Sequence, residues 1–173
     1  MTYADRKKIM NKRRIDFNEY SKMVASICRD INLSNWKPDY VVGVTRGGLL
    51  AATMISHYLN LPMHTLKVAL RDHADSESNL WMSEDAYNGK NILIVDDIND
   101  TGATINWIIQ DWQSSCHPSD AHWLNVWSNT VKFAVIVDNL SSNANVEVSY
   151  SAEEINKADD DVWIDFPYES WWK

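Results

Sequence analysis

A fully apolar, β-branched segment that ends in adjacent carboxylates constrains the fold of this chain more than any other feature. Residues 91–95 (NILIV) follow shortly after Gly89 and lead directly into residues 96–104 (DDINDTGAT). An unbroken run of Ile, Leu and Val is typical of a strand buried on both faces of a parallel sheet. Ligands of open α/β sheets bind at the carboxyl ends of the strands. The sequence therefore predicts a ligand site at residues 96–104.

The residue types of this stretch suit a phosphorylated sugar. Asp96 and Asp97 offer oxygens that can bind Mg²⁺ or accept hydrogen bonds from the paired hydroxyls of a ribose. The turn at residues 101–104 offers hydroxyls and backbone N–H groups where a helix over residues 105–112 is expected to begin, and helix N-termini attract phosphate. The Asp-Asp pair by itself is equally compatible with a plain turn, in which Asp97 caps the next helix.

As a whole, residues 96–104 resemble the phosphoribosyl-pyrophosphate (PRPP) binding motif of the type I phosphoribosyltransferases. In that motif two acidic residues, a spacer, a third Asp and Thr-Gly-x-Thr follow a hydrophobic strand. The resemblance implies that Asp96 and Asp97 hold the ribose hydroxyls and Mg²⁺, and that Asp100 lies by the base nitrogen as a catalytic residue. It further implies that the 5-phosphate is bound by Thr101, Gly102, Ala103 and Thr104.

A second strand, turn and helix pattern lies one βα unit earlier. The β-branched residues 40–44 lead into Thr45, Arg46, Gly47 and Gly48, and an apolar helical pattern follows over residues 49–59. Glycines permit close backbone approach to an anion, and Arg46 adds a charged, bidentate donor. The position resembles that of the pyrophosphate loop in the same family. The resemblance implies a cis peptide between Thr45 and Arg46, and pyrophosphate binding by all four residues, with Arg46 as a second catalytic residue beside Asp100.

Residues 162–168 (VWIDFPY) resemble the C-terminal segment that closes the base pocket of bacterial xanthine-guanine phosphoribosyltransferases. The resemblance implies that Trp163 stacks on a purine and that neighbouring backbone groups, such as those of Ile164, read the edge of the base. The alternative is that Trp163, one of 9 Trp residues, packs structurally. Because stacking accepts any heteroaromatic ring, hydrogen bonds must supply most of the selectivity for the base.

The chain departs from those enzymes at three places. Where they carry a Lys that contacts the purine 6-oxo group, this chain has Asn139, which donates hydrogen bonds without a charge. The long polar segment at residues 71–89 corresponds to their flexible lid, yet it lacks Lys, and Arg71 is its one expected pyrophosphate ligand. Residues 113–131 look like an insertion. They contain an apolar cluster that we expect to form an oligomer interface, namely Trp123, Leu124, Val126 and Trp127.

The rest of the chain completes an α/β pattern. Asp16 and Glu19 form a capping box for a helix that extends to Leu33, further strands are expected at residues 63–70 and 132–137, and residues 146–150 are expected to form an edge or hood strand. We expect a type I phosphoribosyltransferase fold: a central, mostly parallel sheet flanked by helices, with a small hood. As one domain it comprises an N-terminal helical segment (1–36), a PRPP-binding core (37–140) and a C-terminal hood (141–173).

Charge and cysteine content narrow the function further. The net charge of -8 argues against broad nucleic-acid binding, which requires clustered Lys and Arg. The basic residues between positions 6 and 14 are better explained as a solvated helix face than as a nucleic-acid or membrane patch. With 2 Cys, no apolar leader and no apolar span of about 20 residues, we expect a soluble cytoplasmic protein.

The sequence thus predicts a Mg²⁺-dependent transferase, a homodimer or homotetramer, that moves the 5-phosphoribosyl group from PRPP to a purine base and releases pyrophosphate. The guanine, xanthine and hypoxanthine bases are the expected acceptors. Because of the missing lid Lys and the Asn139 position, the alternative is a PRPP- or nucleotide-binding regulatory protein that has lost transfer.

Overall fold

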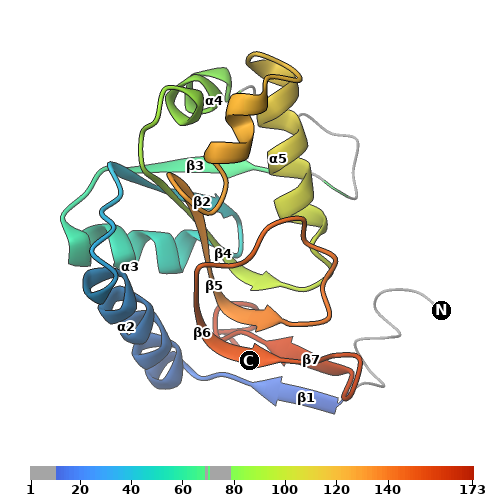
Figure 1. The fold of residues 1–173 in the computed structure, drawn as a ribbon. Helices are drawn as coiled ribbons and strands as arrows, with labels where there is room; N and C mark the ends of the chain where they lie inside the picture. The colour runs from blue at the N-terminus through green and yellow to red at the C-terminus, as the bar shows by residue number, and fades with distance from the viewer. Residues whose placement is uncertain (1–10, 69, 71–78) are drawn as a thin grey trace.

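The computed structural model describes residues 11–68, 70 and 79–173, and its centre is a five-stranded sheet. The strand order is β3-β2-β4-β5-β6, and every neighbouring pair is parallel, so the five strands of this sheet point to the same side (Figure 1). The bounds are β2 (Tyr40–Thr45), β3 (Met63–Lys67), β4 (Ile92–Asn99), β5 (Val131–Asn139) and β6 (Tyr150–Ile155). The predicted parallel sheet is therefore confirmed, with β4 at its centre.

Helices cover both faces of this sheet. α2 (Phe17–Leu33) and α3 (Leu49–Leu59) lie on one face, and α4 (Leu80–Tyr87) and α5 (Ala103–Ser115) lie on the other (Figure 1). Successive side chains of β4 enter the two cores alternately, because Leu93 packs with α2 and α3 whereas Ile94 packs with α5. Both are fully buried, as are the other residues from Ile92 to Val95, which confirms a strand buried on both faces.

The helix starts follow local sequence signals. Asp16 caps α2, since its Oδ1 accepts a hydrogen bond from the N–H of Glu19 at 2.7 Å, and the helix ends at Leu33 as predicted. α5 begins at Ala103, directly after Gly102, which has a φ of 88°. It is longer at both ends than the expected helix over residues 105–112.

A second, two-stranded sheet joins the two ends of the described chain. β1 (Asn11–Arg14) pairs in parallel with β7 (Val162–Asp165). The prediction that the basic residues near the N-terminus form a helix face is therefore wrong for residues 11–14, while residues 6–8 lie outside the described residues. Besides this pairing, the guanidinium of Arg13 binds the carboxylate of Glu19, six residues away, and that of Glu153, 140 residues away.

Three segments differ from their expected secondary structure. β6 lies at residues 150–155 rather than 146–150 and is an edge strand of the main sheet, so the segment after residue 140 does more than form a hood. β3 ends at Lys67, before the expected end at residue 70. Part of the polar segment at residues 71–89 forms the helix α4, whereas residues 71–78, including Arg71, lie outside the described residues.

The apolar residues of the expected insertion belong mainly to the protein's own core. Trp123 and Val126 are buried next to the 3-10 helix η1 (Ala121–Asn125), and the Trp123 ring stacks on Trp127 at 5.9 Å. The indole N–H of Trp123 donates a hydrogen bond to the carbonyl of Cys116 at 3.0 Å. Of the four residues, only Leu124 is exposed, so this cluster is not the surface patch that the interface prediction requires.

The helices of residues 11–68 and 79–173 are all too short or too polar to cross a membrane.

Candidate active site

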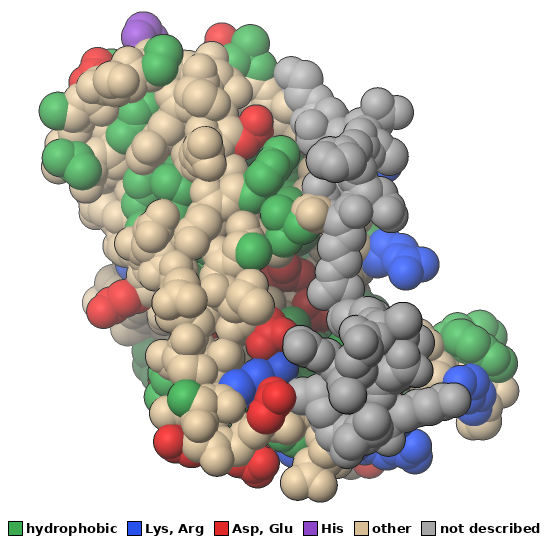
Figure 2. Space-filling model, turned by 90° about the vertical axis from the view of Figure 1, so that its right-hand side faces the viewer, with side chains coloured by type: hydrophobic (Ala, Val, Ile, Leu, Met, Phe, Trp, Pro, Cys, Tyr) green, Lys and Arg blue, Asp and Glu red, His purple; other side chains and the backbone are tan. Residues whose placement is uncertain are grey.

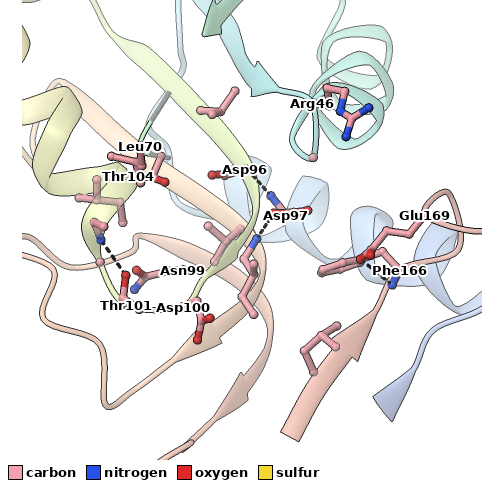
Figure 3. Close-up of a pocket in the computed structure, with 18 of the residues that line it drawn as sticks. Arg46, Leu70, Asp96, Asp97, Asn99, Asp100, Thr101, Thr104, Phe166 and Glu169 are labelled. Atoms are coloured by element: carbon pink, nitrogen blue, oxygen red, sulfur yellow. Dashed lines mark hydrogen bonds between the residues drawn. The ribbon is translucent and has the colours of Figure 1, made fainter. Parts of the chain in front are cut away.

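A cavity of about 850 Å³ opens at the carboxyl ends of the main-sheet strands. Its walls come from the loops after β2 and β4, from β5, from the segment after β6 and from β7 with the residues that follow it (Figure 3). The space-filling view of this side shows acidic side chains, with basic ones among them, gathered in the middle of the face (Figure 2). The cavity therefore combines cationic and anionic groups in one place.

Most of the residues expected to form a site line this cavity. They are Arg46, Gly47, Asp96, Asp97, Asp100, Thr101, Gly102, Ala103, Thr104, Trp163 and Ile164. Thr45, Gly48 and Asn139 are not among the lining residues, and Arg71 lies outside the described part of the chain. The two loops and the distant β7 segment, separated in sequence, thus meet around a single space.

Asp96 and Asp97 lie on β4 where it passes the cavity. The Oδ1 of Asp96 accepts a hydrogen bond from the N–H of Asp97 at 2.9 Å, and the Oδ1 of Asp97 accepts one from the N–H of Ile98 at 2.8 Å. Burial is the main cause that raises the pKa of both carboxyls, and the charge of Asp97 raises the pKa of Asp96 further. Two carboxylates in such surroundings favour a bound cation.

The loop between β2 and α3 packs directly against these carboxylates. A Cβ on Gly47 would lie 2.1 Å from Oδ2 of Asp97, and a Cβ on Gly48 would lie 2.2 Å from the carbonyl oxygen of Val95. Only glycine fits at position 48, where the clash is with backbone, whereas a larger residue at position 47 would displace the Asp97 carboxylate. The peptide between Thr45 and Arg46 is cis, as the resemblance implied, and Arg46 is an exposed residue that lines the cavity.

The turn between β4 and α5 is held by a neighbouring loop. The N–H of Asn143 donates a hydrogen bond to the carbonyl of Thr101 at 2.9 Å, and a Cβ on Gly102 would lie 2.3 Å from the backbone N of Ala144. Gly102 is thus required by its positive φ and by this contact within the protein. The hydroxyl of Thr101 accepts a hydrogen bond from the N–H of Ala103 at 3.2 Å and caps the turn.

Asn139 does not face the cavity, which corrects its expected role as a reader of the base. The residue is 4% exposed, and its side chain joins three backbone segments. Its Nδ2 donates to the carbonyl of Asp100 at 2.8 Å, while its Oδ1 accepts from the N–H of Lys157 at 2.9 Å and from the hydroxyl of Ser141 at 2.8 Å. Because this buried side chain is also absent from the cavity lining, it is not placed to contact a base there.

Lys157 lines the cavity instead, and reasoning from the sequence missed it. Its ammonium lies 2.9 Å from Oδ1 of Asp100, and its side chain is 12% exposed. The signal in the sequence was weak but present, because Lys157 is the one Lys or Arg between residues 133 and 172. Its basic group follows β6, so only the fold brings it to the cavity.

The segment after β7 supplies further residues that had no predicted role. Phe166, Tyr168, Glu169, Trp171 and Trp172 line the cavity together with Trp163 and Ile164. Trp171 and Trp172 are 71% and 64% exposed, whereas Phe166 is buried. Phe166 and Tyr168 lie within the 162–168 stretch that resembles a base-pocket segment, although neither was assigned a role, whereas Glu169, Trp171 and Trp172 follow that stretch.

A family model, "Phosphoribosyl transferase domain", matches residues 16–170. The chain belongs to this phosphoribosyl transferase family. It is 24% identical over 183 residues to a hypoxanthine-guanine phosphoribosyltransferase of Schizosaccharomyces pombe, covering 89% of this chain and 87% of that protein. It is 23% identical over 121 residues to xanthine phosphoribosyltransferase 1 of Saccharomyces cerevisiae, covering 56% of this chain but only 58% of that longer protein.

Solved phosphoribosyltransferase structures share the fold. The purine phosphoribosyltransferase from Pyrococcus horikoshii Ot3 superposes with a TM-score of 0.67 at 22% identity, covering 93% of this chain and 96% of that one. The predicted phosphoribosyltransferase fold is therefore confirmed.

Proposed function

We propose that this phosphoribosyltransferase transfers the 5-phosphoribosyl group from PRPP to an oxopurine of the guanine, xanthine or hypoxanthine type and releases pyrophosphate. One observation carries the proposal: the paired carboxylates Asp96 and Asp97 lie between a glycine turn and a Thr-Gly-x-Thr turn in the same cavity (Figure 3). Such a site has separate places for a ribose, a terminal phosphate and a pyrophosphate.

Each part of PRPP has a proposed partner. The 5-phosphate binds the backbone N–H groups and hydroxyls of residues 101–104 at the start of α5, where the helix dipole favours an anion. The pyrophosphate binds at Arg46 and Gly47, which line the cavity, while Thr45 and Gly48 shape the loop behind them. Because the protein has a net charge of -8, these local donors must overcome an unfavourable overall field.

The residues of the cavity fit Mg²⁺. Asp96 and Asp97 are hard oxygen ligands, and burial raises the pKa of both carboxyls, so a bound cation would stabilise their charged forms. Within residues 11–68 and 79–173, no three metal-binding side chains cluster, so oxygens of PRPP would have to complete the coordination. When bound, Mg²⁺ supplies neutralisation of the leaving pyrophosphate.

The base is proposed to bind on the other side of the ribose, among Trp163, Ile164 and Phe166. Trp163 offers an aromatic face, and Lys157 offers an ammonium group that can only donate hydrogen bonds. A donor at this place favours a carbonyl on the base over an amino group. The names of the relatives, which include hypoxanthine-guanine and xanthine enzymes, support the same class of base.

The proposed reaction is a displacement at the anomeric carbon. A base nitrogen forms the new bond to C1 of the ribose as the bond from C1 to the pyrophosphate oxygen breaks, and Asp100 accepts the proton that the base nitrogen loses. By analogy with glycosyl transfer, positive charge develops on the ribose, and the carboxylates of Asp96 and Asp97 stabilise it. Lys157, bonded to Asp100, holds that carboxylate by the base.

A pyrophosphate-release assay tests the proposal. Purified protein is given PRPP and Mg²⁺ with guanine, xanthine, hypoxanthine, adenine or orotate, and release is expected with one or more of the first three. PRPP binding without release from any base would instead support a regulatory, nucleotide-binding role. The cytoplasmic location and the homo-oligomeric state stay predictions from the sequence.

A further inference from the structure

One hydroxyl connects the segment after β7 to both the β4 carboxylates and the glycine turn. The Tyr168 hydroxyl donates a hydrogen bond to Oδ2 of Asp97 at 2.8 Å, and it lies 3.1 Å from the carbonyl oxygen of Gly47, a second acceptor. A tyrosine hydroxyl carries one proton, so these two acceptors share it. The contact crosses 71 residues of sequence to reach Asp97 and 121 to reach Gly47.

The ring of Tyr168 is fixed by packing on its other sides. It stacks on Phe166 with centroids 5.6 Å apart and an interplanar angle of 4°, and it meets the edge of Tyr20 of α2 at 5.8 Å. Both of these neighbours are buried in the core between α2 and the sheet. The hydroxyl is therefore presented from a rigid support.

Asp97 in turn has little freedom. The N–H of Ile98 binds one carboxylate oxygen, the Tyr168 hydroxyl binds the other, and Gly47 packs so closely that a Cβ there would lie 2.1 Å from Oδ2. If the hydroxyl is removed, one oxygen of Asp97 loses its partner and the carbonyl of Gly47 loses its contact with the segment after β7. Both changes affect groups that are proposed to bind PRPP, namely the carboxylate of Asp97 and the glycine turn at Gly47.

We infer that Tyr168 is a positioning residue that makes PRPP binding depend on the docked segment after β7. The inference rests on the proposed function, because it assigns PRPP to the cavity. Tyr168 itself acts through Asp97 and Gly47, which are the groups proposed to meet the substrate. The segment that begins with β7 thus contributes residues to the wall proposed for the base, and its Tyr168 also holds Asp97 and Gly47 in place for PRPP.

The test is Tyr168→Phe, which keeps the ring and removes only the hydroxyl. The dissociation constant of PRPP with Mg²⁺ is measured by calorimetry, and the KM values for PRPP and for the base are measured by pyrophosphate release. We expect PRPP affinity to fall about tenfold, as for the loss of a hydrogen bond to a charged group. The KM for the base and the melting temperature should change little.

Tyr40→Phe is the matched control. The Tyr40 hydroxyl also donates to a carboxylate, that of Asp85 at 3.1 Å, and neither residue lines the cavity. This control shows whether the loss of a Tyr-Asp hydrogen bond away from the cavity is enough to change PRPP affinity. PRPP affinity is expected to stay at the wild-type value in this variant.

A double-mutant cycle with Asp97→Ala gives a second readout. If Tyr168 acts through Asp97, Tyr168→Phe should weaken PRPP binding much less in the Asp97→Ala background than in the wild type. Additive losses, or unchanged PRPP affinity in Tyr168→Phe, would overturn the inference. Equal losses for PRPP and base, with a lowered melting temperature, would likewise reduce Tyr168 to a packing role. A wild-type protein that binds PRPP without transfer would overturn only the proposed reaction.

Discussion

The ammonium of Lys157 and the carboxylate of Asp100 form an ion pair of 2.9 Å at the edge of the cavity. The pair is anchored from behind, because the amide of the buried Asn139 binds the backbone of both residues. The protein therefore presents a cation and an anion side by side in a fixed arrangement. Such a pair can meet a carbonyl and an adjacent N–H on the edge of a planar base.

We expect Lys157→Met to raise the KM for the oxopurine about tenfold and to leave the KM for PRPP nearly unchanged. The substitution removes the hydrogen-bond donor for the base carbonyl and the partner that orients Asp100. Steady-state kinetics with each substrate varied in turn provide the measurement. Lys90→Met is the control, since Lys90 pairs with Asp85 at 3.3 Å away from the cavity. A similar rise of both KM values would argue against a role in base selection.

Asn139→Leu should lower the free energy of unfolding by about 2 kcal/mol or more, because it leaves the carbonyl of Asp100 and the N–H of Lys157 without their partner. Urea denaturation provides the measurement. Asn32→Leu is the comparison, since Asn32 is exposed and donates one hydrogen bond to the Tyr58 hydroxyl. If the Asn139→Leu protein kept full stability but accepted a different base, the result would support the direct contact between Asn139 and the base that the sequence suggested.

Asp97→Asn should increase stability at neutral pH while it weakens Mg²⁺-dependent PRPP binding about tenfold. Burial raises the pKa of Asp97, so the folded protein holds this proton to a higher pH than the unfolded chain does. The charged carboxylate then costs stability increasingly as pH rises from about 4, the unfolded pKa, through the folded pKa. The melting temperatures of wild type and variant should therefore converge in acid. A variant that is less stable at pH 7 would contradict this.

Gly102→Ala and Gly89→Ala form a natural pair. Both glycines have a φ near 90°, so an alanine at either position costs about 1 kcal/mol of backbone strain. A Cβ at Gly89 meets nothing within 4 Å, whereas one at Gly102 would lie 2.3 Å from the N of Ala144. We expect only Gly102→Ala to lose affinity for a nucleoside 5'-monophosphate, measured by calorimetry. Equal affinities in the two variants would show that the turn at residues 101–104 does not bind phosphate.

Trp163→Ala should weaken purine nucleotide binding by about 1 kcal/mol or more and leave PRPP binding nearly intact, because the indole is assigned to the base alone. Trp112→Ala is the contrast, since Trp112 is fully buried and its loss should cost about 3 to 5 kcal/mol of stability. Parallel losses for both ligands together with a lower melting temperature in Trp163→Ala would indicate that Trp163 only packs.

The parts of the site that lie within single βα units could be predicted from the sequence. The β4 strand, the Asp96-Asp97 pair and the glycine turn before α3 are each specified by neighbouring residues, so apolar runs and turn chemistry were sufficient. The position of residues 96–104 could be predicted because a strand buried on both faces belongs to a sheet that helices cover on both sides. The residues that follow such a strand therefore lie where the strands end.

Other parts depend on contacts that no local pattern encodes. β1 carries Asn, Lys and Arg rather than apolar residues, so its strand conformation comes from its pairing with β7 and from the ion pairs of Arg13. Asn139 was expected to contact the base because its place in the sequence corresponds to that of the Lys that contacts the purine in the enzymes this chain resembles. The amide is buried instead, and Lys157, from a later segment, occupies the cavity wall.

The pairing of β1 with β7 has a consequence for how the protein is made. The register joins Lys12 to Trp163 and Arg13 to Ile164, so the wall proposed for the base requires two segments that are far apart in the sequence. Contacts of such large sequence separation form slowly, and during synthesis they must wait until the last strand has emerged from the ribosome. The turns at residues 45–48 and 101–104, which are proposed to hold phosphate, can already be native at that stage. On this proposal, the nascent chain forms its phosphate-binding turns before the wall proposed for the base.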